Sequence, residues 1–77
     1  MRLAIDKEAD ALLLILRDGS WKRTQAAAKD INLELGDDDE VMAIEVLNLS
    51  GHIGQTALDH LDLNFAPEHE PLEVKIE

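Results

Sequence analysis

Acidic side chains are the residues whose positions best suggest chemistry in this sequence. Glu45 lies inside VMAIEVLNL (residues 41–49), the longest apolar run with β-branched residues, and Asp10 directly precedes the apolar run 11–16. Two carboxylates in a cleft between two subunits could act as acid and base, which would make this a small ligand-binding or hydrolytic protein. A simpler interpretation of Glu45 is a hydrogen bond or ion pair across a sheet. The candidate partners are Arg17, Lys22 and Arg23. We favour this interpretation and assign no catalytic residue.

The other acids and the histidines lack the spacing of a metal site. The run 37–40, DDDE, could bind a hard cation, but calcium loops need alternating ligands, a glycine and a distal bidentate glutamate. The histidines His52, His60 and His69 form no His-x-x-x-His pair, and the chain has no cysteine. A protein-supplied zinc site needs three or four convergent ligands. We therefore expect a solvated turn at 37–40, no metal and no cofactor.

Trp21 is the only tryptophan, and it precedes Lys22 and Arg23. This cluster, together with Arg17, could bind nucleic acid and stack on its bases, but we favour Trp21 as core cover at a hairpin because of its large apolar area. The charge distribution also argues against nucleic-acid binding. Residues 1–36 hold six acids and six bases, whereas residues 37–77 hold eleven acids against one base, which leaves the net charge of −10. Such a field repels phosphates and suits a basic protein partner.

The apolar pattern predicts a small sheet. Residues 2–5 alternate as a short half-buried strand, and residues 31–35 alternate with Ile, Leu and Leu inward and Asn32 and Glu34 outward. Residues 11–16 are apolar on both faces, so they need cover on both sides. Together with 41–49, which would return antiparallel to 31–35, they are the predicted central strands.

Weaker signals connect these strands. Residues 17–23 contain Asp-Gly, which is typical of a tight hairpin turn, and residues 24–29 predict a poor strand. From Ser50 the period becomes helical, with Ser50 as N-cap or Gly54 opening a shorter helix. Residues 64–71 form an acidic linker with two prolines, and LEVKIE (72–77) alternates as a strand. That strand would lie at the edge of its own sheet, swap into a second subunit, or become ordered on a partner.

The predicted fold is α+β in a single domain spanning residues 1–77. It is an antiparallel β-meander of four to six short strands with one amphipathic helix, residues 51–63, packed on one face; an all-β fold is the alternative. The other face would expose apolar side chains, which predicts homodimerisation through it. The candidate partner or interface residues are Trp21, Val41, Ala43, Glu45 and Leu47, together with Leu72, Val74 and Ile76 of the terminal strand.

Two segments resemble a known family. IDKEADALLLIL (5–16) is similar to the opening YDPEADALYIxL of the DUF2283 family, and NLELGDDDEVMAIEVL (32–47) is similar to its DLDxxGxVVGIEIL segment. Ser50 falls where members often have a serine. The resemblance, over about residues 3–50, rests on Asp10, Ala11, Leu12, Ile44 and Glu45. Departures from the pattern are Ile5 and Leu13 at aromatic positions, Lys7 at a proline, and Asp39 and Ala43 at glycines. The resemblance implies a small sheet-rich fold and no activity, because the family is uncharacterised.

We therefore expect a non-enzymatic, dimeric protein-interaction module that binds a basic protein partner and not nucleic acid. Family members resemble the small acidic proteins of two-gene operons, so the comparison with antitoxins is an analogy only. The N-terminus lacks a signal-peptide pattern, and no segment approaches the roughly 20 apolar residues of a membrane span. These features predict a soluble cytoplasmic protein.

Overall fold

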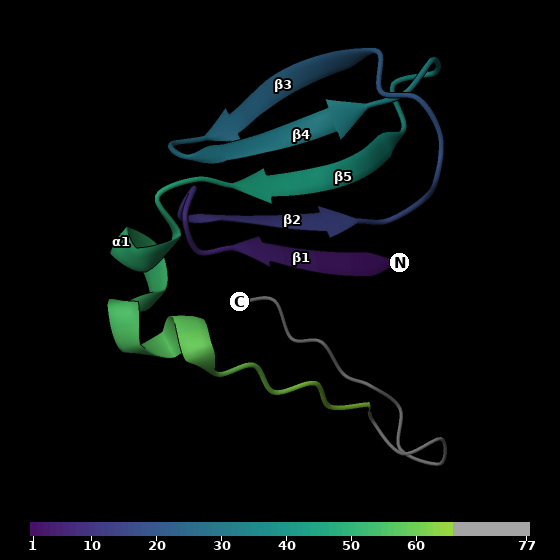
Figure 1. The fold of residues 1–77 in the computed structure, drawn as a ribbon. Coiled ribbons are helices and arrows are strands. Elements are labelled where there is room, and N and C mark those ends of the chain that lie inside the picture. The colour runs from purple at the N-terminus through teal and green to yellow at the C-terminus, as the bar shows by residue number, and fades with distance from the viewer. Residues whose placement is uncertain (66–77) are drawn as a thin grey trace, which may run out of the picture.

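The computed structural model describes residues 1–65, which form one antiparallel sheet followed by two short helical segments (Figure 1). The strands are β1 (Arg2–Asp6), β2 (Ala11–Ile15), β3 (Arg23–Ala28), β4 (Ile31–Leu35) and β5 (Val41–Val46). All five belong to one sheet, and every neighbouring pair is antiparallel. The predicted antiparallel sheet is confirmed, with β2 and β5 as adjacent inner strands.

The strand order is β1-β2-β5-β4-β3, so the sheet is not a simple meander. The β1–β2 hairpin and the β3-β4-β5 meander are joined because β5 pairs with β2. The prediction of a hairpin at residues 17–23 is therefore wrong, since this segment crosses from β2 to the far edge of the sheet (Figure 1). The physical reason lies in the composition of the strands. β2 is apolar on both faces and suits an inner position, whereas all six residues of β3 (RTQAAA) are exposed.

The pairing register gives the sheet two different faces. We call the first the aliphatic face, because across β1, β2, β5 and β4 two of its cross-strand rows consist of leucine, isoleucine and valine alone. These rows are Leu3–Leu14–Ile44–Leu33 and Ile5–Leu12–Val46–Ile31. We call the other the mixed face. Its two rows are Ala4–Leu13–Glu45–Asn32–Ala26 and Arg2–Ile15–Ala43–Glu34–Thr24.

Few apolar side chains are fully buried. Among the described residues they are Leu35, Met42, Ala43 and Leu49, with exposed fractions of 4%, 5%, 0% and 2%. The segment between β2 and β3 approaches the sheet near two of them. The Lys22 N–H donates a hydrogen bond to the Leu35 carbonyl oxygen at 2.7 Å, and a Cβ on Gly19 would lie 2.9 Å from Met42 Cε. The best-buried part of the sheet is thus beside this crossover.

The helical region is shorter than the predicted helix over 51–63. It consists of α1 (Leu49–Ile53), whose N-cap is Asn48 and not Ser50, and the 3-10 helix η1 (Gln55–Asp59). Gly54 separates them with φ 85° and ψ 145°, which is far from helical geometry, so no continuous amphipathic stripe forms. Both segments follow the end of β5 near the β1–β2 turn (Figure 1), and neither packs extensively on a strand.

Several expectations concern residues beyond this description. The predicted strand 72–77, with Leu72, Val74 and Ile76, and most of the predicted linker 64–71 lie outside the described residues. Within residues 1–65, no helix is long and apolar enough to cross a membrane.

Candidate functional site

Asp10 holds the start of α1 against the β1–β2 turn. Its Oδ1 accepts a hydrogen bond from the Ser50 N–H at 2.9 Å, and its Oδ2 accepts one from the Ser50 hydroxyl at 2.7 Å. Its carbonyl oxygen accepts a third from the Leu49 N–H at 2.9 Å. The first N–H groups of a helix have no acceptor within the helix. The Asp10 carboxylate, 40 residues earlier in the chain, supplies an acceptor for the Ser50 N–H. Asp10 thus has a structural role, and we call this contact the Asp10–Ser50 clasp.

Asp10 also has an unusual backbone. Its φ of 55° lies in the left-handed region, which aspartate and asparagine tolerate better than most residues. The clasp therefore needs an aspartate for two reasons, since the side chain must accept two hydrogen bonds while the backbone turns. Sequence reasoning identified Asp10 and Ser50 separately, and the structure brings them together.

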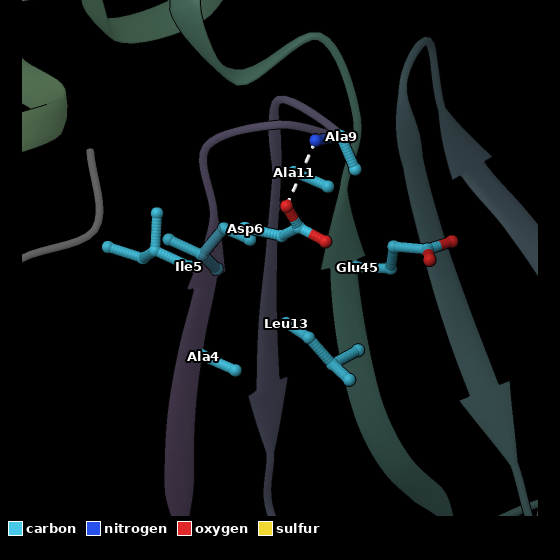
Figure 2. Close-up of a pocket in the computed structure, with 8 residues that line it drawn as sticks. Ala4, Ile5, Asp6, Ala9, Ala11, Leu13 and Glu45 are labelled. Atoms are coloured by element: carbon cyan, nitrogen blue, oxygen red, sulfur yellow. Dashed lines mark hydrogen bonds between the residues drawn. The ribbon is translucent and has the colours of Figure 1, made fainter.

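Glu45 lies on the mixed face and makes the expected hydrogen bond across the sheet. The donor is Asn32 Nδ2 of β4, at 3.1 Å, and not one of the three basic residues considered from the sequence. Figure 2 shows the Glu45 carboxylate turned away from Asp6 and toward the neighbouring strand. The acid pair needed for the hydrolytic alternative therefore does not converge within this chain, because Asp10 faces Ser50 and Glu45 faces Asn32.

A hollow of about 350 Å³ lies beside β1 and β2 (Figure 2). It arises because small side chains stand next to Leu13. Its lining residues are Ala4, Ile5, Asp6, Ala9, Ala11, Leu12, Leu13 and Glu45. The Asp6 Oδ1 accepts a hydrogen bond from the Ala9 N–H at 3.0 Å, which closes the β1–β2 turn. Both carboxylates at the hollow therefore already make hydrogen bonds within the chain.

Glu34 is a buried acid that sequence reasoning missed. The alternation of β4 placed it outward toward solvent, but it is only 6% exposed and is the buried charged residue of the described chain. It stands between Thr24 on β3 and Ala43 on β5, and its carboxylate accepts a hydrogen bond from the Thr24 hydroxyl. The presence of Thr24 could have indicated a hydrogen-bond donor for Glu34, because the two residues lie directly opposite each other. Recognising this requires the β3–β4 register, which the sequence does not give.

Two of the three cations considered for nucleic-acid binding, Arg17, Lys22 and Arg23, are paired with the acidic turn. Lys22 Nζ lies 3.6 Å from Asp37 Oδ1, and Arg23 Nη2 lies 3.0 Å from Asp39 Oδ1. Trp21 is 42% exposed, so it covers the core only in part. A nucleic-acid phosphate would have to compete with carboxylates for Lys22 and Arg23, which argues against that hypothesis.

The predicted interface residues in the described chain have very different surroundings. Ala43 is fully buried, whereas Leu47 is 38% exposed and Val41 is half-buried. Leu49, the last residue of the apolar run 41–49, is 2% exposed. The mixed face therefore offers less apolar surface than the sequence predicted, and the continuous apolar rows lie on the opposite side of the sheet.

The described residues contain no group of three or more histidines and acids that could hold a metal ion. The two histidines of this part of the chain each approach one aspartate. His52 Nε2 lies 3.2 Å from Asp30 Oδ2, and His60 Nε2 lies 3.1 Å from Asp62 Oδ2. The first contact ties α1 to the β3–β4 turn.

Comparison with known proteins bears on the fold more than on the activity. Neither the curated proteins nor the solved structures give a significant match. A family model described as "Protein of unknown function (DUF2283)" matches residues 2–50. The matched segment contains all five strands and both residues of the Asp10–Ser50 clasp. The chain therefore belongs to the DUF2283 family.

Proposed function

We propose that this chain is a non-enzymatic protein-interaction module that binds a basic protein partner. The observation that carries the proposal is the separation of charge along the chain. Residues 37–65 hold seven acids and no lysine or arginine, and residues 37–77 together hold eleven acids and one base. An electrostatic field of one sign attracts and orients a partner of the opposite sign.

The roles of the carboxylates support binding over catalysis. The acids with the most enclosed positions make hydrogen bonds that hold the fold: Asp10 to Ser50, Glu45 to Asn32 and Glu34 to Thr24. A catalytic acid or base must instead be within reach of a substrate atom. The hydrolytic alternative, which needs Asp10 and Glu45 in one cleft, receives no support from this arrangement.

The β4–β5 turn is the part of the described acidic region best suited to a basic partner. Asp37, Asp38 and Asp39 are exposed, and Asp38 makes no ion pair with the described residues. The pairs of Asp37 with Lys22 and of Asp39 with Arg23 are solvent-exposed, and such pairs contribute little to stability. Lysine or arginine side chains of a partner can therefore replace them at small cost.

The test is an affinity pull-down of the tagged full chain from its own cells, at low and high salt, read by mass spectrometry. We expect a stoichiometric basic protein that dissociates as salt rises, because salt screens exposed charges. Changing Asp37, Asp38 and Asp39 to asparagine should weaken capture. The matched control carries Glu8→Gln and Asp18→Asn, which remove acids from the electrically balanced half of the chain.

A second variant examines the rest of the acidic half. Deletion of residues 66–77 removes four acids and one lysine. If neither this deletion nor the triple asparagine variant changes any detectable partner interaction, the proposal is wrong. Recovery of the chain alone, at both salt concentrations, would likewise count against it.

A further inference from the structure

The aliphatic face has no structural cover among the described residues. On β3 its two rows end in Gln25 and Ala28, and across the other four strands they contain eight leucine, isoleucine and valine side chains. Seven of them are half-buried and Ile5 is 36% exposed. Neither α1 nor η1 packs extensively on a strand. Domains are built from at least two packed layers, and within residues 1–65 this sheet has no second layer.

The size of this face suits the centre of an interface. With strands about 4.8 Å apart and a rise of about 3.3 Å per residue, four strands and two rows cover roughly 19 by 13 Å, or about 250 Å² in projection. A stable interface buries about 800 Å² per partner, with an apolar centre inside a polar rim. The aliphatic face provides such a centre, and the surrounding β3 and crossover residues provide polar side chains for a rim.

We infer that a second copy of this chain packs its aliphatic face on that of the first, so that two sheets form a two-layer sandwich. The described chain buries little apolar surface on its own, because only four of its apolar side chains are 5% exposed or less. Whatever covers the face must therefore accompany the chain whenever it is folded. A second copy meets this requirement, and a face of leucine, isoleucine and valine is complementary to itself across a two-fold axis.

Charge also favours this face for self-association. Two copies with a net charge of −10 repel one another over most orientations. The two rows of the aliphatic face carry no charged side chain, so their contact brings no carboxylates into direct opposition. The mixed face would instead bring together the Glu34 and Glu45 carboxylates of two chains. The inference is independent of the proposed basic partner, and its tests use the purified chain alone.

The first experiment measures the mass of the unmodified full chain by sedimentation velocity across a wide concentration range. We expect a species of twice the 8.6 kDa chain mass, with dissociation only on dilution. A chain that remains at 8.6 kDa at every concentration would overturn the inference. That result would indicate that the chain's own residues cover the face.

A matched pair of substitutions then locates the contact. Ile5→Asp places a charge on the aliphatic face at the edge strand β1, and it should weaken dimerisation at least tenfold. Leu63→Asp makes a comparable change at a residue that is 70% exposed and outside the sheet, and it should leave the dimer unchanged. Circular dichroism reports whether each variant folds. A folded Ile5→Asp variant that remains fully dimeric contradicts the inference.

Spin labelling keeps the test valid if Ile5→Asp does not fold. The chain has no cysteine, so a single introduced cysteine carries the label. Gln25, opposite Leu33, and Ala26, opposite Asn32, are exposed neighbours on β3 that belong to opposite faces. On dimerisation, a label at Gln25→Cys should become less accessible to a dissolved paramagnetic reagent, while one at Ala26→Cys should not. The opposite pattern would assign the interface to the mixed face and overturn the inference.

Discussion

The Asp10–Ser50 clasp gives the sharpest test of how this fold is held together. Replacing Asp10 with alanine removes acceptors for the Ser50 N–H and hydroxyl, which lie 2.9 and 2.7 Å from the carboxylate oxygens. It also places alanine at φ 55°, where a Cβ is strained. Both effects lower the free energy of unfolding, and they can be separated by the choice of substitution.

The expected magnitude follows from these two effects. A hydrogen bond to a charged group contributes about 1.5–3 kcal/mol, and the lower end applies because Asp10 and Ser50 are only half-buried. Two such bonds and about 1 kcal/mol of backbone strain predict a loss of about 4 kcal/mol for Asp10→Ala. Asp10→Gly, which relieves the strain, should lose about 3 kcal/mol. Asp10→Asn keeps one acceptor and tolerates the backbone, so about 1.5 kcal/mol is expected.

Urea denaturation measures these losses, and one fixed protein concentration keeps any contribution of self-association to the stability constant. Asp38→Ala is the matched control, because Asp38 is exposed and makes no hydrogen bond or ion pair with the described residues; it should stay within about 0.5 kcal/mol of the unmodified chain. A double-mutant cycle with Ser50→Ala should show a coupling energy of about 1 kcal/mol. Additive losses in that cycle, or an Asp10→Ala variant as stable as the control, would refute the assigned role.

Substitutions at three further positions examine other parts of the fold. Gly19→Ala should lose about 1–3 kcal/mol in urea denaturation, because φ is 136° and the new Cβ would lie 2.9 Å from Met42 Cε; an unchanged midpoint would contradict this reading of the crossover. Glu34→Ala should lose about 1–2 kcal/mol because the Thr24 hydroxyl loses its acceptor, whereas Glu34→Gln should retain most stability by the same assay. Arg23→Ala should change stability by less than about 1 kcal/mol, and its effect should shrink at high salt, because the pair is exposed. A large, salt-independent loss would show that Arg23 has a different role.

Local patterns in the sequence predicted the strands better than they predicted their arrangement. Alternation in β1 and β4 and the apolar run in β2 depend on neighbouring residues, and these strands form where expected. The order of strands depends on the pairing of β2 with β5, which joins residues far apart in the chain. An Asp-Gly pair is compatible with a hairpin, but it does not specify which strand follows. Residues 17–23 therefore suggested a turn where the chain makes a crossover.

The sequence identified individual residues of the candidate site, but not the contacts between them. Asp10 and Ser50 were recognised through separate matches to the family pattern, but their contact depends on β5 ending beside the β1–β2 turn. Glu34 was predicted to face solvent because alternation shows which residues share a face of the sheet, but not how exposed that face is. The helix over 51–63 was overestimated because apolar spacing continues past Gly54, whereas the backbone there leaves helical geometry.

The strand order has a consequence for how the chain folds. The β1–β2 hairpin and the β3-β4-β5 meander each consist of contacts between neighbouring strands in sequence, and the crossover is their only covalent link. The pairing of β2 with β5 and the Asp10–Ser50 clasp both join residues far apart in the chain, and the two clasp residues are 40 positions apart. These contacts form only after the two units have formed, because distant contacts require loop closure first. A cut within the crossover would leave each unit's own strand pairings within one fragment. Mixing the fragments would then measure the β2–β5 pairing and the clasp together, with any folding coupled to them, as a bimolecular affinity.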